Sequence, residues 1–299
     1  MTFVLSTLRK SPAYAELATR CRVHSVLFSP ISELKIGGSG TLVRFKNFCG
    51  ILTATHVIAN HIESRQIFAP MQKTEDAKTF FNVSIPLLNI LYLETPQGIK
   101  ALQGSVPGQR TYWHPGTLDI CLLQIDSKLF EDLLLNSGKQ AVDLLKHKAD
   151  YIKNRDLYTL ANEQYTPWIW AIDGSPREDA EHDKNRILQS RYDGLYVCVG
   201  SKQGTYKTDP LTLVKTPFDQ DADRIQHDLG PTIDDIPFAF AGISGGGMHQ
   251  VSFDGKNGPE TISNALFSGV CVAEIQGECL YSRGPSALYD IFVTYLDTL

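Results

Sequence analysis

Short apolar runs bounded by turn residues dominate the chain and predict strands along most of its length. The runs that carry this pattern are 39–45, 48–55, 81–85, 119–125, 195–200, 247–253 and 265–275. Glycine, asparagine, aspartate and proline separate them, and these residues favour turns. The pattern predicts a mostly β protein.

Helical signals interrupt the strands at three places. Ser11 followed by Pro12 has the pattern of an N-cap with proline at the first helical position, which predicts a short helix to about Arg20. Residues 127–151 predict two helices, with Gly138 as the break between them. The segment 286–299 places apolar residues at helical spacing and predicts a terminal helix.

The order of these elements predicts two antiparallel β-barrels or sandwiches rather than a parallel α/β sheet. We expect an N-terminal barrel over residues 1–126, a helical connector over 127–162 and a C-terminal barrel with the terminal helix over 163–299. The connector is longer than a simple linker needs. Packing across the two barrels is its expected role, and a docking surface for a protein partner is the alternative.

Composition narrows the class of protein further. The chain has 299 residues, of which 42% are hydrophobic and 20% charged, as in ordinary globular proteins. Its net charge of −5 argues against nucleic acid as the main partner, because phosphate binding requires a basic face. No apolar run is long enough to span a membrane, and the N-terminus makes a poor secretory signal. We therefore expect a cytoplasmic protein with neither a nucleic-acid nor a membrane partner.

The six cysteines are dispersed and have no zinc-ligand spacing. Most lie in apolar strand-like runs, which predicts free buried thiols in a reducing compartment. A bridge between Cys271 and Cys279 across a hairpin is the alternative. The acidic segment 217–235 has an incomplete calcium-loop pattern, so a solvated loop is expected there. We expect no metal and no cofactor.

One serine lies in a glycine cluster, at Ser244 in the segment 240–251. The local sequence matches the nucleophile elbow of α/β-hydrolases, but residues 248–251 continue as a strand where that fold requires a helix. A phosphate-binding loop would need a lysine in the cluster, and none is present. Two interpretations remain open at this point: a glycine-rich turn with an incidental serine, or a nucleophile.

Two further residues favour the nucleophile. His56 follows an apolar strand, and Asp119 opens the later apolar strand 119–125. A serine hydroxyl needs a neighbouring base, which an imidazole supplies near neutral pH. A carboxylate on the other ring nitrogen fixes the imidazole tautomer. The chain order His56, Asp119, Ser244 is the order of the chymotrypsin triad.

Three motifs resemble the trypsin/chymotrypsin-like serine protease family, in its non-secreted bacterial or viral type. Residues 53–57 resemble its histidine motif, 118–123 its aspartate motif and 242–246 its Gly-x-Ser-Gly-Gly motif. Residues 267–270 resemble the glycine-containing strand that walls its substrate cleft. The resemblance implies a serine endopeptidase that acts on proteins or peptides through an acyl-enzyme.

The chemistry then assigns a role to each residue. His56 is expected to act as base and acid, Asp119 to orient it and Ser244 to attack the substrate. The backbone amides of Gly242 and Ser244 are expected to form the oxyanion hole. If Asp119 faced away from His56, Asp126 would be the nearest substitute carboxylate in the sequence.

Two departures from the family change the expected regulation. Activated secreted members carry an aspartate immediately before the serine, where this chain has Ile243. Activation by a cleaved N-terminus is therefore not expected, and a regulatory protein partner is a candidate for ordering the loop. The cysteine usual beside the catalytic histidine is also absent, since Val57 and Ile58 follow His56.

The resemblance also locates the substrate pocket. It implies walls from residues 236–241 and 270–274, among them Phe238, Ala239, Val272 and Glu274. Apolar walls predict a preference for a small or medium apolar side chain before the cleaved bond. The rival is a carboxylate in the pocket, from Glu274 or from Asp234 and Asp235, that would bind arginine or lysine. Two other functions also remain open: a binding module with a vestigial site, and an esterase that uses the same triad.

Overall fold

The structure is a computed structural model that describes residues 12–29, 37–59, 65–73, 76–93, 118–160, 168–174, 180–181, 189–190, 195–198, 224–228, 242–254, 261–275 and 279–299. It is mostly β, as the sequence predicts, and contains two six-stranded sheets.

The N-terminal sheet is built from consecutive antiparallel pairs. Its order is β1 (Ser25–Phe28), β2 (Gly38–Phe45), β3 (Phe48–Thr53), β7 (Cys121–Gln124) and β6 (Asn89–Tyr92), and β8 (Val142–Asp143) pairs parallel with β2. A separate hairpin consists of β4 (Gln66–Lys73) and β5 (Asp76–Pro86). Ser29 and Phe68 form a bridge that joins this hairpin to the end of β1.

The C-terminal sheet is antiparallel throughout. Its order is β12 (Leu195–Cys198), β9 (Trp168–Asp173), β14 (Gly247–Asp254), β15 (Thr261–Ile275), β16 (Cys279–Arg283) and β13 (Arg224–Asp228). A further two-stranded sheet pairs β10 (Ala180–Glu181) with β11 (Gln189–Ser190). The strand after the glycine cluster, β14, confirms that no helix begins there.

The structure confirms the predicted β-rich class but does not show two complete barrels. Over the described ranges neither six-stranded sheet closes on itself, because its first and last strands are not paired with each other. The β-rich class is therefore established, and closure of the barrels is not.

The helices occur where the sequence predicts them, except for the short helix at 55–58, which begins at the end of a segment predicted as a strand. They are α2 (Pro12–Arg22), α3 (Thr55–Ile58), α5 (Ser127–Ser137), α6 (Leu144–Leu160), the π-helix η3 (Ser286–Phe292) and α8 (Val293–Leu296). Asp126 caps α5 by accepting the amides of Lys128 and Leu129. Gly138 ends this helix at φ 63°, a left-handed conformation that suits glycine. The wide π turns were not expected from the helical spacing.

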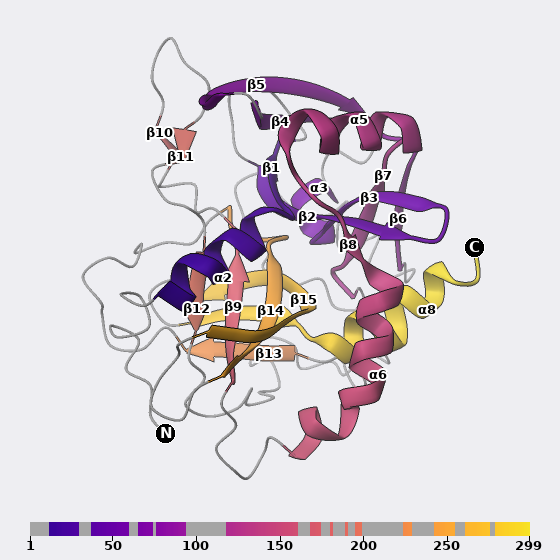
Figure 1. Cartoon of the computed structure of the whole chain (residues 1–299). Coiled ribbons are helices and arrows are strands. Elements are labelled where there is room, and N and C mark those ends of the chain that lie inside the picture. Colours follow the sequence, from indigo (N-terminus) through magenta and orange to yellow (C-terminus); the bar gives the residue numbers. More distant parts are fainter. Residues whose placement is uncertain are drawn as a thin grey trace.

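The two sheets share one core with the terminal helix. Val43 and Leu52 of the N-terminal sheet lie in the same buried cluster as Phe267 of β15 and Phe292 of η3. In Figure 1, α6 runs beside the C-terminal helix, shown in yellow. The two strand-rich halves are therefore joined by apolar packing as well as by the chain.

The N-terminal helix crosses to the opposite half. Leu17 of α2 packs in a buried cluster with Ala171, Val251 and Ile262 of the C-terminal sheet. Figure 1 shows α2, in indigo, lying across the region of β9, β12 and β14. The first helix of the described residues thus covers a sheet formed by the second half of the chain.

Four cysteine thiols are described, and all are buried and form no disulfide bond: Cys21, Cys49, Cys121 and Cys271. The alternative bridge from Cys271 to Cys279 is therefore wrong. In the described part of the chain, no helix is both long and apolar enough to cross a membrane.

Candidate active site

His56 lies where β3 ends and a short helix begins. Ala54 is extended at φ −78° and ψ 136°, and α3 starts at the next residue. The amide of Val57 donates to the carbonyl of Ala54 and closes the turn. The side chain of His56 is 25% exposed, so its ring is held by the protein and still reaches solvent.

Asp119 contacts His56 twice. Its Oδ2 lies 2.9 Å from His56 Nδ1, and its Oδ1 accepts the backbone amide of His56 at 2.9 Å. The carboxylate is only 7% exposed. Since Oδ2 accepts from Nδ1, the neutral ring keeps its second nitrogen, Nε2, available as a base.

The backbone of Asp119 is in the left-handed region, at φ 55°. This conformation is uncommon for any residue other than glycine, although aspartate and asparagine tolerate it best. Leu118 and Ile120 on either side are fully buried and hold the segment in place. Strained backbone supported in this way is typical of functional sites.

The environment of His56 favours its protonated form. Burial by itself lowers the pKa of the imidazole, but the charge of Asp119 and its hydrogen bond outweigh burial, so the pKa is raised above 6.5. The arrangement stabilises an imidazolium, the species that a general base becomes when it takes a proton.

Ser244 lies in a tight loop shaped by its glycines. Gly242 has φ 105° and Gly245 has φ 90°, values that L side chains rarely adopt. The amide of Gly246 donates to the carbonyl of Ile243 at 2.8 Å. Gly245 donates to Cys271, and Cys271 donates back to Gly246, which fixes the loop against β15.

The serine loop is also held against the N-terminal sheet. Ser39, in β2, donates its amide to the carbonyl of Ser244 at 2.9 Å and its hydroxyl to the carbonyl of Gly242 at 2.9 Å. Thr53, at the end of β3, donates its hydroxyl to the carbonyl of Ser39 at 2.8 Å. Because His56 follows Thr53 by three residues, these bonds bring the serine loop and the histidine turn to the same place.

Sequence reasoning missed Ser39 and Thr53. Both are small polar residues in strands whose neighbours are buried and apolar, and that is the one signal the sequence offers. Their partners are backbone atoms, which no sequence pattern identifies.

The hydroxyl of Ser244 makes no hydrogen bond to His56 among the bonds of the described residues. Catalytic hydrogen bonds are often long or misaligned in unliganded enzymes, so this looseness is compatible with a triad. Within the same described set, the amides of Gly242 and Ser244 donate to no backbone carbonyl, unlike those of Gly245 and Gly246.

The remaining predicted residues fall in different places. Asp126 caps α5, so it does not orient His56. Val272 is fully buried in the core shared with the terminal helix. Phe238, Ala239 and the carboxylates of Asp234 and Asp235 lie outside the described residues, as does most of the acidic segment 217–235. Glu274 is described only in its backbone, in β15.

In the described part of the chain, no group of three or more histidine, cysteine, aspartate or glutamate side chains has the geometry to hold a metal ion. Comparison with known proteins gave no identification: no protein-family model matches the chain, and no curated protein matches it.

Proposed function

We propose that the protein is a serine endopeptidase of the trypsin/chymotrypsin-like type. The observation that carries the proposal is the double contact of the buried Asp119 carboxylate with His56, beside a serine loop held in place by Ser39. A histidine oriented by a buried carboxylate, with its other nitrogen free, has little structural purpose, whereas a general base requires it.

The mechanism follows from these contacts. His56 Nε2 takes the proton of Ser244 as its hydroxyl attacks the scissile carbonyl, and Asp119 stabilises the imidazolium that forms. The amides of Gly242 and Ser244 stabilise the oxyanion of the tetrahedral intermediate. His56 then gives its proton to the leaving amine, and a water molecule releases the acyl group by the same steps.

The fold proposal accompanies the function. Two antiparallel β-barrels would place this site between them, and the two six-stranded sheets would form part of those barrels. The support for this arrangement is the pair of hydrogen bonds from Ser39 in the first sheet to the serine loop of the second, with Thr53 bonded to Ser39.

Labelling with a fluorophosphonate probe tests the nucleophile. We expect the wild type to be labelled and Ser244→Ala to be unlabelled while it keeps its fold, since the other side chains of the site remain. The matched control is Ser263→Ala, an exposed serine of β15 that should be labelled like the wild type. Labelling of Ser244→Ala at the wild-type rate would refute the assignment, and no labelling of the wild type would favour a binding module.

Cleavage profiling on a peptide pool separates a peptidase from an esterase. We expect cleavage that is lost in Ser244→Ala, with a small or medium apolar residue before the cut bond. Dominant cleavage after arginine or lysine, abolished by Glu274→Gln, would overturn the apolar pocket and leave the triad standing. Ester hydrolysis without peptide cleavage would favour the esterase.

A further inference from the structure

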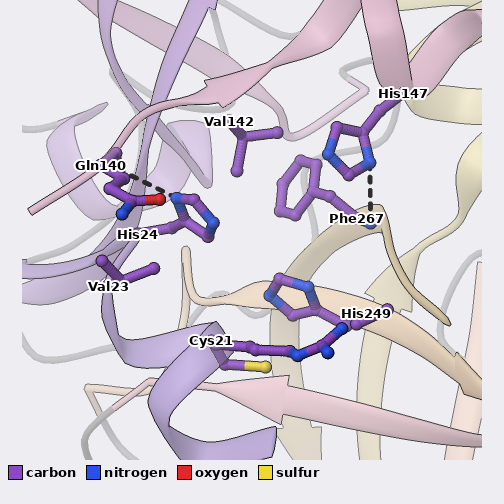
Figure 2. Close-up of a pocket in the computed structure, with 10 residues that line it drawn as sticks. Cys21, Val23, His24, Gln140, Val142, His147, His249 and Phe267 are labelled. Atoms are coloured by element: carbon purple, nitrogen blue, oxygen red, sulfur yellow. Dashed lines mark hydrogen bonds between the residues drawn. The ribbon is translucent and has the colours of Figure 1, made fainter. Parts of the chain in front are cut away.

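A cavity separate from the proposed cleft lies between α2, the connector and the C-terminal sheet. It has a volume of about 180 Å³. The described residues that line it are Arg20, Cys21, Val23, His24, Gln140, Val142, His147, His249, Ala265 and Phe267. Figure 2 shows three imidazoles in this space, from the turn after α2, from α6 and from β14.

Hydrogen bonds determine which ring nitrogen of two of the imidazoles carries the proton. His24 donates from Nδ1 to the carbonyl of Gln140 at 3.0 Å, which leaves its Nε2 unused by this bond. His147 accepts the amide of Phe267 on Nδ1 at 3.2 Å, so its neutral ring carries the proton on Nε2. Both bonds are drawn in Figure 2.

The third imidazole, that of His249, has no hydrogen-bond partner among the described residues. His249 is 4% exposed and lines the cavity, and neither of its ring nitrogens makes a hydrogen bond to a described residue. Phe267 contacts its ring edge-on, with centroids 5.4 Å apart. A molecule bound in the cavity could therefore supply a hydrogen bond to this ring.

The described lining of the cavity includes a cation and no carboxylate, although Asp143 and Asp150 act on His147 and Asp173 acts on Cys21. Arg20 carries the one permanent charge among the described lining residues, and no carboxylate is among them. Glu16 binds Arg20 from one turn earlier in α2, at 2.5 Å, but the guanidinium has further donors. The lining thus offers a cation, three imidazoles and an apolar wall of valine, alanine and phenylalanine.

All three imidazoles are neutral near pH 7. Burial lowers the pKa of His249, and the nearby His24 and His147 also lower it, to about 3 in all. The pKa of His147 is lowered to about 4, chiefly by burial; Asp150 and Asp143 oppose this, whereas His24 and Lys146 contribute to it. Burial also lowers the pKa of His24, with Lys139 adding to the effect and the Gln140 bond opposing it.

We propose that this cavity binds a small organic carboxylate with an apolar body, of about the size of benzoate. A cavity of ~150 Å³ holds benzene in a protein core, so the available volume fits a single ring or a short chain. The carboxylate would accept hydrogen bonds from Arg20 and from the rings of His249 and His147, and the apolar body would lie against Phe267 and Val142. A metal ion is a poorer fit, because the described histidines and Cys21 do not converge on one point.

Calorimetric titration with benzoate tests the proposal, with benzamide as the uncharged molecule of the same shape. We expect saturable binding of benzoate and none of benzamide. Arg20→Gln and His249→Gln should each weaken binding ~tenfold or more, the effect of losing about 1.4 kcal/mol. Lys128→Gln, which removes an exposed charge from α5, is the matched control and should bind as the wild type does.

Binding should also tighten as the pH falls from ~7.5 to ~6, because a carboxylate in the cavity favours protonated imidazole. Arg20 is on the exposed side of α2, so Arg20→Gln keeps the test valid even if His249→Gln fails to fold. Absence of saturation, equal binding of benzamide, or unchanged affinity in Arg20→Gln would overturn the proposal. A peptide with a free C-terminal carboxylate should not compete with benzoate. Competition by the peptide would overturn the assignment of the ligand as a small organic acid.

Discussion

Asp119 is the one charged side chain that raises the pKa of His56 in the described site, and the dependence of the rate on pH should reveal this. A raised pKa means that His56 loses its proton above pH 6.5. The rate should therefore rise with pH through a midpoint above 6.5, because only the neutral ring can accept the proton of Ser244. In Asp119→Asn, burial still lowers the pKa of His56, whereas the carboxylate charge and its hydrogen bond, which raise that pKa, are lost. The pH midpoint of the rate should therefore move below 6.5.

The same variant should lower kcat by roughly 10⁴, the cost of losing the orienting carboxylate in a triad. Asp126→Asn is the matched control, because Asp126 caps α5 and does not touch His56. Its pH profile should equal that of the wild type. An unchanged midpoint in Asp119→Asn would show that Asp119 does not control the base.

At the scale of single residues, the sequence predicted the candidate catalytic side chains but not the residues that position them. His56 and Asp119 follow from residue type and chain order, and the structure brings them within hydrogen-bond distance. Ser39 could not be identified, because its hydroxyl bonds a backbone carbonyl 203 positions away. The left-handed backbone of Asp119 was equally hidden, since aspartate also occurs in ordinary turns.

The serine loop depends on one glycine more than on the others, and Gly245→Ala should show it. A Cβ on Gly245 would lie 2.0 Å from the carbonyl oxygen of Ser39 and from the hydroxyl of Thr53, at a backbone φ of 90°. The loop must then move away from β2. We expect nearly complete loss of probe labelling at Ser244 and a lower free energy of unfolding.

Gly138→Ala is the control for the backbone effect alone. Gly138 also has a positive φ, at the end of α5, where alanine should cost about 1–2 kcal/mol of stability. Labelling should be unaffected in this control. Equal labelling in the two variants would mean that the close approach of Gly245 to Ser39 has no part in positioning the serine.

Element types were more predictable than their tertiary details. Apolar runs and turn residues located β2, β3, β14 and β15, and helical spacing located the terminal helix. The π turns of η3 were not predictable, because Tyr289 donates its hydroxyl to Phe267 of β15 and Tyr151 of α6 donates to Asp290. Such contacts come from distant elements and leave no local periodicity.

At the scale of the whole molecule, the core shared by both sheets should make unfolding a single transition. Phe292 is fully buried in that core, and Phe292→Ala should lower the free energy of unfolding by about 3–5 kcal/mol. Urea unfolding followed by tryptophan fluorescence and by circular dichroism checks this, and the two curves should coincide. Leu299→Ala, at a site 61% exposed, should change stability little. Two separated transitions would show that the halves are independent.

The shared core also sets an order of events during synthesis. His56 and the strand β3 before it are made long before Phe292, yet Leu52 of β3 and Val43 of β2 belong to the same buried cluster as Phe292. A nascent chain that has not reached this helix leaves that apolar surface open to water, and such a chain is exposed to aggregation and to chaperones. The hydrolytic site proposed here would therefore mature late, so a growing chain could not cut the proteins around the ribosome that makes it.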